Sequence, residues 1–134
     1  MQAGLVILSL KIAVFAVTLL WLSAMVALAL GNKRLHGRIN IVFFSLTLAA
    51  LVALEIVVRI IHPGLFNSYF KPEERTLMTV HLSFAIPSAA LLFIMLFSGL
   101  TRRRSFHIAT GILFAIFWTG TFITGIFFLP HDPR

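Results

Sequence analysis

The chain has 134 residues, of which 60% are hydrophobic and 11% are charged, and its formal net charge is +7. A soluble domain of this length needs far more polar surface, so the composition excludes an ordinary soluble protein. The chain has no cysteine, which excludes disulfides, thiolate metal sites, iron–sulfur clusters and covalent c-type haem attachment. Any metal or haem ligand must therefore come from histidine, methionine or a carboxylate.

Four apolar stretches are each long enough to cross a bilayer, which takes roughly 20 helical residues. They cover approximately residues 4–30, 39–61, 77–100 and 108–129. They lack the alternation of apolar and polar residues typical of barrel strands, so helices are expected to satisfy the backbone. The first stretch is too long for a signal peptide and is expected to be retained. The sequence predicts a single all-α domain over residues 1–134, an integral membrane four-helix bundle.

Glycine and proline mark the expected ends of these helices. Gly31-Asn32 ends the first helix and Pro63-Gly64 ends the second. Pro72 followed by Glu73-Glu74 begins the third, because proline suits the first turn and acids favour the positive end of the helix dipole. Pro87 lies inside the third span, where it indicates either a kink beside a site or an ordinary transmembrane proline.

The basic residues gather in the first and third loops, whereas the middle loop balances Lys71 and Arg75 with two glutamates. The clustered residues are Lys33, Arg34, Arg38, Arg102, Arg103 and Arg104. This positive-inside pattern predicts that loops one and three are cytoplasmic and that both termini are outside. The positive charge is expected to meet anionic membrane lipids and no nucleic acid.

The two halves of the chain resemble each other, since each reads span, basic cluster, histidine, span, then proline with histidine. At about 1.5 Å per residue, the histidine spacing within each half is roughly one membrane crossing. His36 and His107 therefore define an inner level. His62 and His131 define an outer level, to which His81 adds. Only a few residues match between the two halves, so the alternative to an internal repeat is a coincidental similarity.

Histidine in or beside a bilayer is costly unless it binds something, so each of these residues is a candidate site. At the outer level, Glu55, Arg59 and His62 share one helix face. An isolated charge at the depth of Glu55 costs about 2.5–3.5 kcal/mol, which pairing with Lys11 or Arg59 would offset. Glu74 lies one heptad before His81. These residues predict an ion-pair network of Lys11, Glu55, Arg59 and Glu74.

The functional interpretation of the outer level is a metal or haem site that opens to the outside. Its expected metal ligands are His62, His81 and Glu55, which suit copper, zinc or iron. The alternative is a structural ion-pair network with histidines at the headgroups. At the inner level, His36 and His107 are expected to be facing ligands or half of a haem clamp, or else ordinary interfacial histidines. His131, near the chain terminus, is expected to have no such role.

Small residues are expected where helices approach closely, namely Ala85, Ala89, Gly120, Thr124 and Gly125. The sequence contains no motif that combines a catalytic nucleophile with a base, so no enzyme activity is predicted.

The histidines and their neighbours resemble those of a family of small four-span bacterial membrane proteins with four characteristic histidines, the CtaM-like family. The matching residues are Leu35-His36-Gly37-Arg38, Ile61-His62, His81, Phe106-His107, Gly111, Trp118 and Thr124-Gly125. The match spans roughly residues 30–129. This chain departs from the family in having Gly37, where arginine is common, and in its charged second span.

The resemblance implies cofactor-binding roles for His36, His62, His81 and His107, and a place in the bacterial inner (plasma) membrane. It implies an accessory or assembly factor of a respiratory cytochrome oxidase that binds haem or copper. Two alternatives stay open. One is a structural subunit of a large respiratory or photosynthetic membrane complex. The other is a bis-histidine b-type electron carrier.

Overall fold

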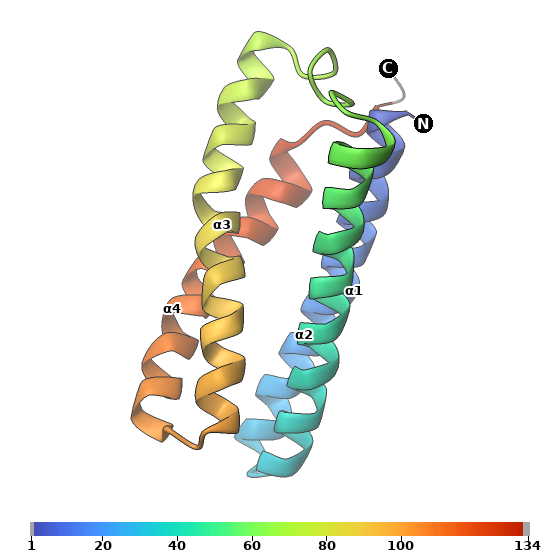
Figure 1. Ribbon diagram of the computed structural model, residues 1–134. Coiled ribbons are helices and arrows are strands. Elements are labelled where there is room, and N and C mark those ends of the chain that lie inside the picture. Colours follow the sequence, from blue (N-terminus) through green and yellow to red (C-terminus); the bar gives the residue numbers. More distant parts are fainter. Residues whose placement is uncertain (1, 133–134) are drawn as a thin grey trace. The chain divides into compact units, whose positions relative to one another are not determined.

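The computed structural model describes residues 2–132, and every regular element within them is helical (Figure 1). This confirms the predicted all-α class. The described residues form two compact units, one made of residues 2–76 with 129–132 and the other of Leu77–Phe128. Each unit is built around one helical hairpin.

The first hairpin pairs α1 (Ala3–Ala29) with α2 (Lys33–Ile56), which run antiparallel and side by side (Figure 1). A five-residue π-helical segment, η1 (Val57–Ile61), prolongs α2. The helix α2 begins before the predicted span at residue 39, because the Asn32 side chain accepts a hydrogen bond from Leu35 N at 3.0 Å and caps the helix. The basic residues after Asn32 therefore form its first turns.

The second hairpin pairs the part of α3 (Pro72–Leu100) from Leu77 onward with α4 (Arg104–Ile123), which η2 (Thr124–Phe128) prolongs as another π-helical segment. The predicted helix start at Pro72 is confirmed. Glu74 Oε2 accepts a hydrogen bond from Lys71 N at 2.9 Å, which satisfies a donor just ahead of the first turn. Pro87 lies inside α3, which continues to Leu100.

The tight turns of the two hairpins are built alike. In the first, Gly31 has a φ of 78° and Asn32 N donates to Ala27 O at 2.9 Å. In the second, Arg102 has a φ of 55° and Arg103 N donates to Ser98 O at 3.1 Å. Both are Schellman motifs, which require a left-handed residue just after the helix. The expected end of the first helix at Gly31-Asn32 is thus confirmed, and the two halves share one turn geometry.

Four helices are long and apolar enough to cross a membrane. They are Ala3–Ala29, Lys33–Ile61, Pro72–Leu100 and Arg104–Phe128. Large apolar side chains cover their exposed surfaces, among them Ile12, Ile86 and Ile116. Exposed apolar helices of this length are typical of a multi-pass membrane protein.

Candidate functional site

His107 lies in the first turn of α4, and its ring is held by groups at the end of α3. Its Nδ1 lies 3.1 Å from Met95 O and 3.0 Å from Ser98 Oγ. The Ser98 hydroxyl itself donates to Met95 O at 3.0 Å. A carbonyl oxygen can only accept, so the acceptors assign the proton to Nδ1. The lone pair of the neutral ring then sits on Nε2, the nitrogen available to a ligand.

Gly99 gives the His107 ring its space. A Cβ at Gly99 would stand 3.2 Å from Cε1 of the ring and 3.4 Å from Nδ1. The ring is therefore fixed by two hydrogen-bonding groups and by close backbone contact. A metal-binding histidine commonly has its other nitrogen donating to a backbone carbonyl in this way.

His36 occupies the equivalent place in the first hairpin. Its Nδ1 donates to Ala24 O at 2.9 Å, and the acceptor lies 12 residues earlier, the same separation as between Met95 and His107. Here Nε2 is occupied as well, because Asn40 Nδ2 lies 3.0 Å from it. The buried Oδ1 of Asn40 has no hydrogen-bond partner among the described residues.

His81 is held in a third way, within the second hairpin. Its Nδ1 lies 2.9 Å from Thr124 Oγ1, whose hydroxyl donates to Gly120 O at 2.7 Å. Because the Thr124 hydroxyl proton is already used in the bond to Gly120 O, Thr124 Oγ1 accepts from His81 Nδ1–H. The lone pair of the His81 ring is then on Nε2. A Cβ at Gly125 would lie 3.0 Å from the His81 ring.

The prediction of close helix approach at small residues is confirmed for two glycines. Gly125 faces the His81 ring, and a Cβ at Gly120 would overlap the ring of Phe84. Phe84 also packs against Phe117, with ring centroids 6.3 Å apart.

The charged residues predicted as one network have the following contacts. Glu55 pairs with Arg59 one turn later, which is one of the two partners expected for it. Lys11 Nζ donates to Leu129 O at 2.7 Å and lies 3.3 Å from His131 Nδ1. Glu74 accepts from the backbone at the start of α3. The network as a whole stays a prediction.

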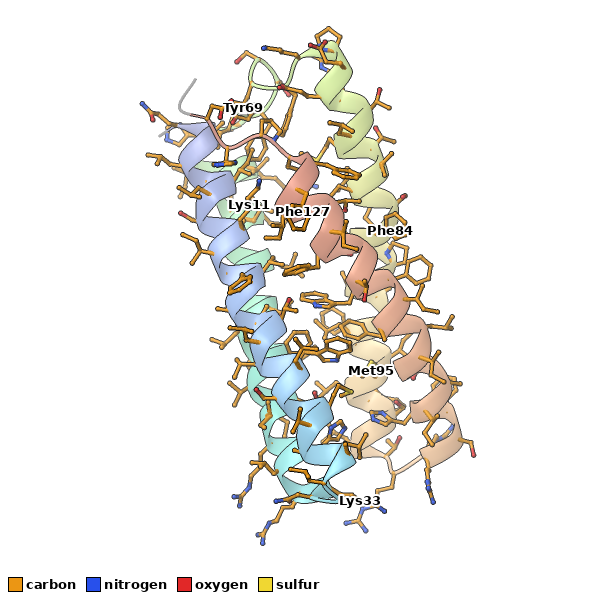
Figure 2. The ribbon with its side chains drawn as sticks, turned by 180° about the vertical axis from the view of Figure 1, so that it is seen from behind. Lys11, Lys33, Tyr69, Phe84, Met95 and Phe127 are labelled. Carbon is orange, nitrogen blue, oxygen red and sulfur yellow. The ribbon has the colours of Figure 1, made fainter. Side chains whose placement is uncertain are left out.

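Lys11 belongs to a contact that the sequence did not indicate, with the C-terminal strap, Leu129–Asp132. Tyr69 Oη also donates to Asp132 O at 3.1 Å. Gly4 packs so closely on the strap that a Cβ there would overlap the Asp132 backbone. Figure 2 shows Lys11 and Tyr69 toward the same end of the first unit. The cation within α1 is therefore used to hold a backbone carbonyl.

Among residues 2–132, no group of three or more histidine and acidic side chains is arranged to hold a metal ion. The predicted metal ligands Glu55 and His62 belong to the first unit and His81 to the second. His62 is exposed just after η1. The three-residue metal site stays a prediction.

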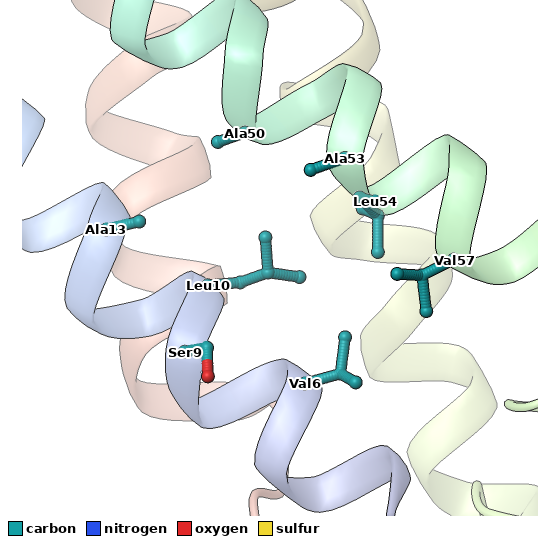
Figure 3. Close-up of a pocket in the computed structure, with 8 residues that line it drawn as sticks. All are labelled: Val6, Ser9, Leu10, Ala13, Ala50, Ala53, Leu54 and Val57. Atoms are coloured by element: carbon teal, nitrogen blue, oxygen red, sulfur yellow. The ribbon is translucent and has the colours of Figure 1, made fainter. Parts of the chain in front are cut away.

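A groove of about 290 Å³ lies between α1 and α2 (Figure 3). Its lining is apolar except for Ser9, whose hydroxyl donates to Leu5 O at 2.9 Å. The other lining residues are Val6, Leu10, Ala13, Ala50, Ala53, Leu54 and Val57. These side chains offer no metal ligand.

The histidines are visible in the sequence, but two residues that contact them, Ser98 and Asn40, are not indicated by it. Thr124 is indicated only as a small packing residue. One available signal was the helical spacing of four residues between His36 and Asn40. Ser98 has no such signal, because it reaches His107 across the turn. No protein-family model matches the chain, and no curated protein or solved structure is detectably similar to it.

Proposed function

We propose that this protein is a membrane accessory factor that binds haem through single imidazoles and serves the assembly of a respiratory cytochrome oxidase in the bacterial inner membrane. The observation that carries the proposal is the way His81 and His107 are held. Each donates its Nδ1–H to a fixed acceptor within its own hairpin, so the lone pair lies on Nε2. Nε2 is the nitrogen that an iron would take.

Haem fits this arrangement better than a bare metal ion. The two imidazoles of the second hairpin lie toward opposite ends of it, His81 beside Thr124 and His107 beside Ser98. They are separated by roughly 25 Å along α3 at about 1.5 Å per residue. Each therefore acts as a single ligand from this hairpin. A haem iron needs only one or two protein ligands, because the porphyrin supplies four nitrogens. Copper or zinc sites usually need three or four protein ligands.

The chain's own residues would hold and release this cargo. Met95 O and Ser98 orient the His107 ring, and Thr124 orients the His81 ring. Both ligands are neutral nitrogens, and the chain has no thiolate to hold iron permanently. Few neutral ligands suit a carrier that passes haem to a partner complex.

The test is haem binding by the full chain in a mild detergent. Iron protoporphyrin IX is added, and the visible spectrum is recorded for the natural protein and for His81→Ala and His107→Ala. His131→Ala is the matched control, because that ring lies on the C-terminal strap beside Lys11. We expect the haem bands to weaken in the first two variants and to persist in the control.

A second arm measures the amount of assembled oxidase in cells that lack the protein and are complemented with each variant. Normal oxidase levels with His81→Ala and His107→Ala, together with no haem bands in the natural protein, would refute the proposal. Co-purification at fixed stoichiometry with a large complex, without haem, would favour a structural subunit. A stable haem with reversible redox bands would favour an electron carrier.

A further inference from the structure

The two turn-end histidines, His36 and His107, are held alike but differ in one neighbour. Each donates Nδ1–H to a carbonyl 12 residues earlier on the preceding helix. Four positions after His36 stands Asn40, which donates to Nε2 at 3.0 Å. Four positions after His107 stands Gly111, where a Cβ would meet no atom within 4 Å. Residues four apart on a helix lie one above the other, so both neighbours adjoin their histidine.

We infer that His107 is the ligand-binding member of this pair and that Asn40 closes His36 to ligands. The residue four positions after each histidine thus determines whether its ring is accessible to a ligand. Nε2 of His107 receives no hydrogen bond from any residue between 2 and 132. The assignment of haem to His107 rests on the proposed function. The difference in access between the two rings stands on the geometry alone.

The orientation of the Asn40 amide supports this inference. Its NH₂ group faces Nε2 of His36, while its buried Oδ1 is left without a partner in the described residues. Reversing the amide would set its oxygen against the nitrogen lone pair, so the lone pair fixes the orientation. A ligand that approaches His36 must first displace this amide. Breaking one hydrogen bond of ordinary strength weakens binding by about tenfold.

The test measures the access of each ring without any cofactor. Diethyl pyrocarbonate transfers its carbethoxy group to a neutral imidazole nitrogen, and mass spectrometry of digested protein gives the rate at each histidine. The full chain is compared with Asn40→Ala, Gly111→Asn and Gly111→Ala. We expect His107 to react about tenfold faster than His36 in the natural protein, as the loss of one hydrogen bond predicts.

Asn40→Ala should raise the rate at His36 toward that of His107, and Gly111→Asn should lower the rate at His107. Gly111→Ala adds bulk without an amide and should leave His107 within about twofold of its natural rate, because its Cβ meets open space. Equal rates at the two rings in the natural protein, or no acceleration at His36 in Asn40→Ala, would overturn the inference. The Asn40 arm decides the matter even if Gly111→Asn does not fold.

The same variants are then titrated with iron protoporphyrin IX. Weaker haem binding by Gly111→Asn, with no loss in Gly111→Ala, supports the inference and the proposed function together. The expected reactivity pattern with no haem binding by any form supports the difference in ring access and refutes the proposed function. Haem binding unchanged by Gly111→Asn but lost in His36→Ala overturns the inference.

Discussion

A methyl group added at Gly120 tests the packing of the second hairpin most directly. Its Cβ would overlap the Phe84 ring, so the ring or the helix must move. A matched substitution is available on the same helix at Gly111, where the added methyl meets nothing within 4 Å. Both changes replace glycine by alanine inside α4, so they share the same change in helix propensity.

The expected magnitudes follow from two opposing terms. Replacing glycine by alanine within a helix stabilises it by about 1 kcal/mol. Overpacking a tight contact costs about 1–3 kcal/mol. Gly111→Ala should therefore be more stable than the natural protein by about 1 kcal/mol. Gly120→Ala should fall below Gly111→Ala by about 1–3 kcal/mol, because only it incurs the overpacking term.

Unfolding of both variants is followed by circular dichroism in one detergent, with Phe84→Leu and the Gly120→Ala, Phe84→Leu double variant completing a mutant cycle. The cycle should give a coupling energy of about 1–3 kcal/mol, since the smaller side chain makes room for the methyl. Equal stability of Gly120→Ala and Gly111→Ala, with no coupling to Phe84, would show that α3 and α4 do not meet at this point.

Three further predictions concern the turns, one histidine and the chain end. Gly31→Ala should destabilise the first turn by about 1 kcal/mol, and Arg102→Gly should stabilise the second by a similar amount, because the backbone of both residues is in the left-handed region. Thermal unfolding measures both changes, and a shift of both variants in the same direction would contradict the prediction. Thr124→Val should lower the free energy of unfolding by about 1–3 kcal/mol, because it removes the acceptor for the His81 ring. Thr124→Ser keeps the hydroxyl and should stay near the natural value, and identical melting of the two variants would count against the His81–Thr124 hydrogen bond. Lys11→Met should raise amide hydrogen exchange in the C-terminal strap by about fivefold, since one hydrogen bond to Leu129 O is lost; unchanged exchange would show that the cation does not hold the strap.

Much of the fold follows from local sequence rules. The spans follow from apolar length, because a membrane helix needs roughly 20 such residues. The ends at Gly31 and Pro72 follow from backbone chemistry that is fixed within a few residues. The turn at Arg102 was less evident, because a non-glycine residue in the left-handed region carries no sequence signal.

The histidines themselves were visible in the sequence, because imidazole is unusual in an apolar chain. Which nitrogen each ring offers was decided by tertiary structure. That choice depends on Met95 O and Ser98 for His107 and on Thr124 for His81, and these partners come from a neighbouring helix. These hydrogen-bond partners come within reach of the histidines only when the helices pair, so no local sequence pattern predicts them.

Composition and hydropathy thus determined a chain of four membrane-length helices with histidines near their ends. The tertiary structure decided that Lys11 holds the C-terminal strap through Leu129 O. It also decided that Nδ1 of His36 donates to Ala24 O on the preceding helix. The physical reason is that apolar length is a property of each segment alone, whereas the hydrogen-bond partner of a polar group depends on which segments the fold brings together.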